Sequence, residues 1–283
     1  MALVKLWPRR VLGEIVRRLW QHQFMLMAAA IAFYWLVGII PLLLLGSSAV
    51  GYLVGSTDRG VDEVMAVLHR MIPRASSREL EDFLRPLIHS RHITGVLGIG
   101  FLLWVGIGTF EAIASSLTTL CGDQETRSFL RRKFVALVMM GSTGLLFVSA
   151  LMGNWILAAW QDIQFVLGTR IDLPVFLSAR GFPRYVTSGL MAVLLTIIYR
   201  VAPVRSIRWP WAVLGAIIAT GLWDQARRAF SWYLVHYAQY NLFYGILGSF
   251  IGLVLWIYYT AVILLAGGLI ADVLDRGGRT RRG

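Results

Sequence analysis

Charged residues and cysteine are scarce in this sequence, and both shortages narrow the class of protein. Only 15% of the 283 residues are charged, whereas 57% are hydrophobic and the mean hydropathy is +0.67, which lies outside the soluble range. The single cysteine, Cys121, excludes an intrachain disulfide and cannot form a zinc site by itself. The sequence also lacks a G-x-x-x-x-G-K-[ST] motif, so ATP-driven activity would need a separate subunit.

Long apolar runs alternate with short charged stretches along the whole chain. Each run is long enough to cross a hydrocarbon core of about 30 Å. We therefore predict an all-α polytopic membrane protein in which residues 1–283 form a single membrane domain, with a bend in the first span at Pro41. The six predicted transmembrane helices cover residues 24–53, 93–120, 134–160, 182–198, 211–234 and 244–273.

Two segments have helical periodicity but are too polar to be spans. Residues 1–24 place basic side chains among apolar ones, which predicts an N-terminal amphipathic helix lying on the membrane. Residues 55–92 carry six basic and six acidic side chains, with apolar positions at helical spacing. We predict a short helical extramembrane segment there, serving either as a lid over the bundle or as a surface that docks a partner.

Lysine and arginine are distributed unequally between the two sides of the predicted bundle. Sixteen lie on the side of the two termini and nine on the other, which places both termini in the cytoplasm. We therefore attribute the formal charge of +12 to basic residues that set the membrane topology, and we expect membrane lipids as their partners. No basic-aromatic recognition motif accompanies it, so nucleic acid is not expected as a partner.

Ionisable side chains inside the predicted spans are the candidate functional residues, because each costs about 2.5–3.5 kcal/mol on insertion scales. Asp224, Arg227 and Arg228 lie on the fifth span, with Asp224 about 20 Å from its cytoplasmic start. Asp224 and Arg228 have the spacing of an intrahelical ion pair. We predict that these three residues form a polar site open to the outer half of the membrane and suited to an anionic head group.

Glu111 is the fourth candidate of this intramembrane polar site. It lies about 27 Å along the second span, where an interfacial position and a buried functional one are equally compatible with the sequence. A direct ion pair between Glu111 and Arg228 is not expected. The polar stripes of the two spans would instead line successive parts of one cavity.

The sequence offers little for catalysis. Its five histidines are scattered, and only His89 and His92 lie close together, in the segment predicted to face outward. We therefore predict no catalytic residue, no cofactor and no metal site.

Several short motifs, in order along the chain, resemble the YihY/BrkB family of bacterial inner-membrane proteins. They are Ala28–Tyr34 leading to Pro41, Glu125–Arg131, Tyr199–Pro203 and Tyr244–Gly248. The resemblance implies a six-span, multi-pass inner-membrane protein, for which export of an envelope component has been considered. It also implies that the label ribonuclease BN, a tRNA-processing role carried by some members, is a misassignment. The motif and helix-packing residues are Tyr34, Pro41, Tyr199, Arg200, Pro203, Tyr244, Gly245, Gly248 and Gly252.

Two positions depart from the pattern of that family. Thr118 stands where the family tends to have asparagine, and Gly267–Ala271 replaces a Gly-Ala-Glu-Leu-Asn pattern. Any mechanism that depends on the missing glutamate and asparagine is weakened here.

Three classes of function follow from these observations. The first is a transporter or flippase-like protein for an anionic or amphipathic envelope component, such as an anionic lipid or envelope precursor. The alternative is a non-enzymatic membrane scaffold or assembly factor. A membrane-bound enzyme, including a tRNA-processing ribonuclease, ranks last. The sequence leaves open the substrate, the direction and energy coupling of transport, and the oligomeric state.

Overall fold

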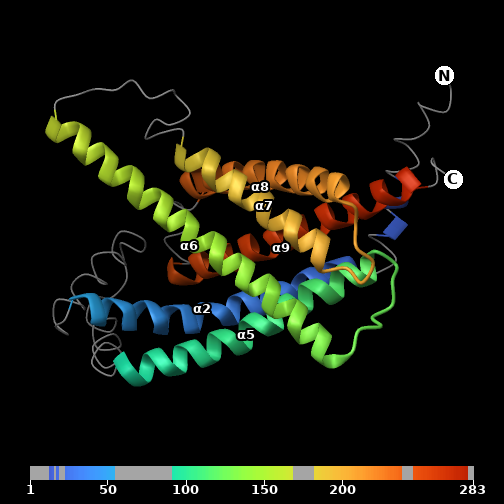
Figure 1. The fold of residues 1–283 in the computed structure, drawn as a ribbon, viewed down its shortest axis with the longest axis horizontal. Helices are drawn as coiled ribbons and strands as arrows, with labels where there is room; N and C mark the ends of the chain where they lie inside the picture. The colour runs from blue at the N-terminus through green and yellow to red at the C-terminus, as the bar shows by residue number, and fades with distance from the viewer. Residues whose placement is uncertain are drawn as a thin grey trace.

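The protein is built from long helices. The computed structural model describes residues 13–15, 17–18, 23–54, 91–167, 182–237 and 245–279, and no strand occurs within these ranges. The all-α prediction is therefore confirmed for the described part of the chain. The six long helices are α2 (Phe24–Val54), α5 (Arg91–Leu120), α6 (Phe129–Leu167), α7 (Phe182–Val201), α8 (Trp209–Tyr237) and α9 (Gly245–Arg279) (Figure 1).

Four of these helices contain segments long and apolar enough to cross a membrane. The segments are Phe24–Gly46, Gly95–Leu120, Phe129–Ala150 and Phe250–Gly278. The predicted fourth span forms a helix with a shorter apolar part, Thr187–Val201. The predicted fifth span forms α8, but polar residues such as Asp224 and Gln225 interrupt its apolar run. Each of the six predicted spans is thus a helix. By length and apolar composition alone, four of the six are long enough to cross a membrane.

The extramembrane predictions are tested only in part. Residues 13–15 and 17–18 of the predicted N-terminal helix are helical. The predicted outer segment, residues 55–92, lies outside the described residues apart from its last two, which begin α5. Pro41 lies inside α2, which continues to Val54, and the bend stays a prediction.

Successive helices run in opposite directions, so their ends gather at two places. At one end, called the terminal end, α2, α6 and α8 begin and α5, α7 and α9 finish (Figure 1). The other is called the distal end. The connections 121–128 and 202–208 lie at the terminal end. The helical residues before α2 also contact the bundle there.

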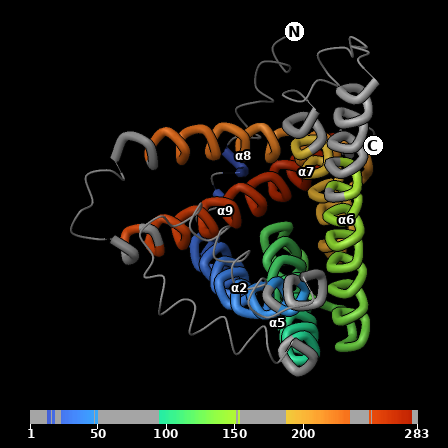
Figure 2. The backbone as a smooth tube through the Cα atoms, turned by 90° about the vertical axis from the view of Figure 1, so that its left-hand side faces the viewer, coloured from blue at the N-terminus to red at the C-terminus, as the bar shows by residue number. Residues whose placement is uncertain are grey.

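The six helices form a closed ring of neighbours. Each packs against the next in the order α2, α5, α6, α7, α8 and α9, and α9 returns to α2. Helix α9 also contacts α5 and α7 across the ring. Viewed from the end (Figure 2), α8 and α9 extend together toward the left, away from α2, α5 and α6.

Small residues allow very close helix packing in the half of the ring nearer the terminal end. A Cβ placed on Gly215 of α8 would lie 2.7 Å from the Cβ of Ala271 and 2.8 Å from the carbonyl oxygen of Gly267. A Cβ on Gly267 would lie 2.6 Å from the Cβ of Ala219 and would also meet the hydroxyl of Tyr199. Helices in lipid associate through such close approaches, because lipid tails are as apolar as leucine. These glycines therefore hold α7, α8 and α9 together.

Among the described residues, the distal half is packed more sparsely. Helices α2 and α5 stay in contact, because a Cβ on Gly98 would lie 3.0 Å from Leu45. Helices α8 and α9 meet where Phe230 approaches Gly252. Among the described residues of α2 beyond Gly38, α7 before Leu195, α8 beyond Thr220 and α9 before Ile257, the only buried positions are Pro41, Ser48 and Gly252. The two ends of the ring thus differ sharply in packing.

Candidate functional site

The predicted polar site on α8 is partly assembled. Ser188 of α7 donates a hydrogen bond to Asp224 Oδ2 at 2.9 Å, and Arg227 Nη2 lies 3.4 Å from Asp224 Oδ1. The partner of Asp224 within the helix is therefore Arg227, three residues on, and not Arg228 as the four-residue spacing suggested. Arg228 is exposed. We call Ser188, Asp224, Arg227 and Arg228 the α8 site.

Aromatic side chains support the α8 site from the same helix and from α9. The guanidinium of Arg227 lies over the ring of Trp223, 5.6 Å from its centroid. Trp223 in turn lies 6.0 Å from Trp256 of α9. Two buried polar atoms of α8, Trp223 Nε1 and Thr220 Oγ1, have no hydrogen-bond partner among the described residues. Thr220 lies three residues before Trp223 and four before Asp224. At this spacing side chains are neighbours on a helix, so polar groups continue along one face of α8.

Glu111 belongs to a different contact. Its Oε2 accepts a hydrogen bond from Lys133 Nζ at 2.7 Å, which joins α5 to α6. Its Oε1 is buried and without a hydrogen-bond partner in the described part of the chain. The structure thus brings Asp224 and Arg227 together and pairs Glu111 with a residue that the sequence analysis did not consider.

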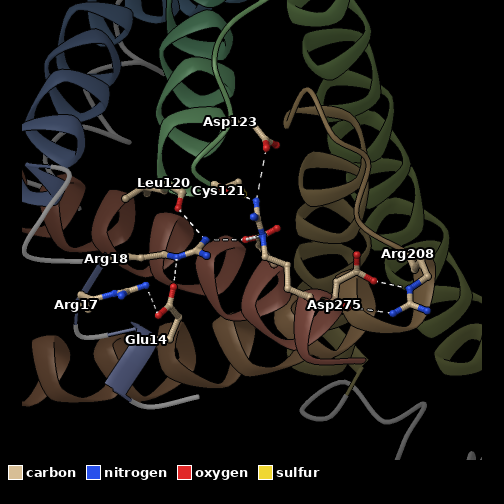
Figure 3. A network of polar contacts seen from close by, with 10 residues as sticks. Glu14, Arg17, Arg18, Leu120, Cys121, Asp123, Arg208 and Asp275 are labelled. Atoms are coloured by element: carbon tan, nitrogen blue, oxygen red, sulfur yellow. Dashed lines mark hydrogen bonds and ion pairs between the residues drawn. The ribbon is translucent and has the colours of Figure 1, made fainter. Parts of the chain in front are cut away.

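A second polar cluster lies at the terminal end (Figure 3). Asp272 makes contacts with two of its arginines. Arg18 Nη1 and Arg276 Nε donate hydrogen bonds to the same oxygen, Asp272 Oδ2, at 2.9 and 2.8 Å. The same two arginines reach the end of α5, where Arg18 lies 3.5 Å from the Leu120 carbonyl and Arg276 donates to the Cys121 carbonyl. The Asp272 side chain is 5% exposed. One buried carboxylate therefore connects three distant segments.

Further ion pairs extend this cluster on both sides. Glu14 binds Arg17 at 2.5 Å and Arg18 at 2.8 Å. Arg208, at the start of α8, pairs with Asp275 at 2.5 Å, and the Asp275 side chain is 4% exposed. We call this cluster the terminal network. It consists of Glu14, Arg17, Arg18, Asp123, Arg208, Asp272, Asp275 and Arg276.

The connection after α5 is fixed to the end of α7 by one arginine. Arg127 donates to the carbonyl oxygens of Val201, Ala202 and Pro203 at 3.3, 2.8 and 2.6 Å. Carbonyl groups at a helix C-terminus have no partner within the helix, so a cation there caps α7. Two of the motifs found in the sequence, Glu125–Arg131 and Tyr199–Pro203, are therefore halves of one contact.

Burial shifts the pKa of two groups in this connection. Removal from water raises the pKa of the Cys121 thiol, which leaves it protonated and slow to react. Removal from water also lowers the pKa of the Arg127 guanidinium. Outside the ring, the hydrogen bond from Arg18 holds the pKa of the Glu14 carboxyl below its usual range.

The remaining motif residues have mainly packing roles. Tyr199 is fully buried and donates a hydrogen bond to the Leu264 carbonyl at 2.8 Å. A Cβ on Gly108 would lie 2.7 Å from the ring of Tyr34. Arg200 binds the Ile207 carbonyl at 2.8 Å. Gly245 and Gly248 lie in the first turn of α9, and Tyr244 is outside the described residues.

Sequence reasoning missed the terminal network. Asp272 and Asp275 are three residues apart at the end of an apolar run, and Arg276 follows at the four-residue spacing of an ion pair. That local pattern was available. The partners Arg18 and Arg208 are far away in the sequence, and no local pattern identifies them. In the described part of the chain no group of three His, Cys, Asp or Glu side chains is placed to hold a metal ion.

Comparison with known proteins now decides the family. The family model described as "Virulence factor BrkB" matches residues 15–282. The chain belongs to this family. The expected resemblance to YihY/BrkB proteins is therefore confirmed over nearly the whole sequence.

Curated relatives are distant but cover most of the chain. A "Putative ribonuclease-like protein YfkH" from Bacillus subtilis is 25% identical over 94% of this chain and 95% of its own length. A "UPF0761 membrane protein" from Tolumonas auensis is 23% identical over 97% of this chain and 89% of its own length. A further one from Idiomarina loihiensis is 26% identical over 74% and 71%. No solved structure matches the chain. The protein is thus a membrane protein of the BrkB family.

Proposed function

We propose that this BrkB-family protein is a transporter or flippase-like protein that moves an anionic or amphipathic envelope component. The observation that carries the proposal is the difference between the two ends of the ring. Four arginines and four acidic residues close the terminal end, whereas the distal half has few buried positions and contains the α8 site. Contacts that hold one end together, with a polar site in the other half, are the arrangement that alternating access requires.

The proposal includes six spans and a definite orientation. Helices α7 and α8 count as spans because they complete the ring between α6 and α9 and run its length in opposite directions. Among the described residues, most of the exposed arginines lie at the terminal end, including Arg131, Arg132 and Arg205, which favours the cytoplasmic side. Both termini would then be cytoplasmic, in the inner membrane of a bacterium. The distal end, with the α8 site, would open outward.

The charge of the α8 site favours an anionic head group. Arg227 shares Asp224 with Ser188, and Arg228 adds a second positive charge. Two guanidinium groups against one carboxylate leave an excess positive charge on a helix that we propose as a span, where an unpaired charge is costly. A phosphate or carboxylate matches the donor fork of arginine. A lipid supplies such a group together with acyl chains that remain in the membrane while the head group moves.

The decisive experiment measures movement of a labelled anionic lipid in proteoliposomes. Purified protein is reconstituted with fluorescent phosphatidylglycerol, and head-group movement is followed by quenching from outside. The test variant is Arg227→Gln with Arg228→Gln. Its matched control is Arg131→Gln with Arg132→Gln, an adjacent exposed pair at the start of α6 that removes the same charge. Phosphatidylcholine serves as the neutral substrate.

We expect protein-dependent movement of phosphatidylglycerol that the Arg227/Arg228 variant loses and the Arg131/Arg132 variant keeps. Equal movement in both folded variants would contradict the role of the α8 site. No movement of any anionic lipid by folded wild-type protein would reject lipid transport and leave the scaffold function. The printed name of the Bacillus subtilis relative is ribonuclease-like, and RNA cleavage is not the activity that we propose for this chain.

A further inference from the structure

We propose that Arg18, Asp272 and Arg276 form a gate at the terminal end, which opens when an anionic head group replaces the Asp272 carboxylate on the two arginines. The inference rests on the proposed transport function, because it assigns a second place where the same head group is held. It differs from the α8 site in its residues, in its end of the ring and in the experiment that tests it.

The geometry of the gate resembles an anion-binding site that is occupied by a carboxylate of the protein itself. Both guanidinium groups direct a nitrogen at the same oxygen, Asp272 Oδ2, over 2.9 and 2.8 Å. Arginine binds phosphate and carboxylate through the same planar set of donors. A lipid phosphate can therefore accept the hydrogen bonds that the Asp272 carboxylate now accepts from the two arginines.

The gate joins segments that must separate if the terminal end is to open. Arg18 and Asp272 are 254 residues apart, and Arg276 and the Cys121 carbonyl are 155 apart. The contacts thus tie the helical residues before α2 to the ends of α5 and α9. Arg208 with Asp275 makes a separate tie between α8 and α9. Breaking the contacts of Asp272 would release the N-terminal segment and leave the α8–α9 pair intact.

Opening by thermal motion alone is unfavourable at this position. The side chains of Arg18 and Arg276 are 13% and 31% exposed, and separation would leave both charges without Asp272. Removing one partner from a buried ion pair is destabilising. Here both arginines would lose the buried carboxylate that they share and would keep only their more exposed contacts with Glu14 and Asp123 as acidic partners. A ligand shifts such an equilibrium only if it binds the open state better. An anionic group that pairs with the released arginines meets that requirement.

Cys121 provides a natural reporter of the gate. It is the only cysteine in the chain, it is 1% exposed, and its carbonyl accepts the hydrogen bond from Arg276. Opening of the gate would admit water and a thiol reagent to Cys121. The measurement is the rate of maleimide alkylation of folded full-length protein, followed by mass spectrometry, below the melting temperature of each variant.

The test variant is Arg18→Gln and its matched control is Arg17→Gln. Both arginines belong to the same segment and both bind Glu14, but only Arg18 reaches Asp272. We expect alkylation on the order of tenfold faster in Arg18→Gln and unchanged in Arg17→Gln. Arg276→Gln probes the same carboxylate from α9 and replaces the first variant if that one does not fold. Equal rates in the test and control variants would overturn the gate.

The anionic ligand is tested with wild-type protein in three media. Phosphatidylglycerol vesicles should accelerate alkylation of Cys121 relative to phosphatidylcholine vesicles. Acceleration by inorganic phosphate in phosphatidylcholine would assign the site to a soluble anion, whereas no acceleration by either anion would overturn replacement of the carboxylate. Because alkylation does not require transport, repeating it in the Arg227→Gln/Arg228→Gln variant separates the two proposals. If this variant loses lipid movement but its Cys121 is alkylated as in the wild type, the α8 site is needed for lipid movement and not for opening of the gate.

Discussion

The terminal and distal ends of this ring use charge in opposite ways. At the terminal end, Asp272 and Asp275 are almost completely buried and each is matched by arginine. In the distal half, Asp224 near the middle of α8 has one serine and one long contact to Arg227, and the neighbouring Arg228 is exposed. Balanced, buried charge fixes segments together, whereas unbalanced, accessible charge is available to a ligand. The comparison separates the polar residues that hold segments together from those to which we assign the proposed function.

The same contrast holds for two glycines of α8. Gly215 of α8 touches α9 through Ala271 and the Gly267 carbonyl, whereas Gly221, less than two turns further along the same helix, faces open space. Glycines of the same helix therefore have two different packing environments. At the terminal end it allows a close approach between backbones, and toward the distal end it has no such contact.

The largest expected effect separates the two ends by removing one carboxylate from each. Asp272→Ala should lower the free energy of unfolding by about 3–5 kcal/mol, because it leaves Arg18 and Arg276 without their shared partner. Asp224→Ala should cost only about 1 kcal/mol, the contribution of an ordinary hydrogen bond. Unfolding in detergent micelles, followed by circular dichroism, measures both. Equal losses would show that the two carboxylates have the same structural role.

A smaller effect is expected from one substitution made twice in α8. Gly215→Ala should destabilise the protein by about 1–3 kcal/mol, because the new methyl group meets Ala271 and a backbone carbonyl that cannot move aside. Gly221→Ala should stabilise it by up to about 1 kcal/mol, since alanine is the better helix former and no atom lies nearby. Opposite shifts in melting temperature are the expected result. A shift of the same sign in both would contradict the difference in packing.

Tyr199→Phe should have a moderate effect confined to the terminal end. It removes the hydrogen bond to the Leu264 carbonyl and leaves the aromatic ring in place. We expect a loss of about 1 kcal/mol. Hydrogen exchange should increase around α7 and the second half of α9 and remain unchanged in α6 beyond Ala150. A uniform increase would indicate that the two ends unfold together.

The smallest effect is a pH dependence at the edge of the terminal network. The Arg18 hydrogen bond lowers the pKa of Glu14 below 4.5, so the unfolded chain takes up the proton first as pH falls. The contribution of the Glu14 contacts is therefore complete above 4.5 and disappears as pH falls through the lower pKa of the folded state. The melting-temperature difference between wild type and Glu14→Gln should be present at about pH 6 and vanish in acid. A difference that persists in acid would assign it to packing.

The sequence predicts the helices of this fold better than its contacts. All six helices were expected, because long apolar runs are a strong local signal. The start of α6 at Phe129 was placed five residues too late, since Arg131, Arg132 and Lys133 look like a connection but continue the helix. The choice of Arg228 over Arg227 as the partner of Asp224 followed the favoured spacing. Side-chain orientation on α8 decided otherwise.

Contacts between distant segments could not be predicted in the same way. Nothing local connects Arg18 with Asp272, and both residues look like ordinary charges near the end of a span. Gly267 and Gly268 were visible only as a departure from the family pattern. In the structure they make room for Tyr199 and Leu117. Such relations depend on how helices are placed in three dimensions, and a single sequence contains no direct record of that placement.

The central claim is that the α8 site is open to water from outside while the terminal end is closed. It is tested most directly by single cysteines in a Cys121→Ala background, placed at Ser188 and at Thr196, about 12 Å apart along α7. A small membrane-impermeant thiol reagent is added to the outside of intact cells. We predict that Ser188→Cys is modified and Thr196→Cys is not. Modification of neither, or of Ser188→Cys only after the cytoplasmic side is exposed, would contradict an outward-open α8 site.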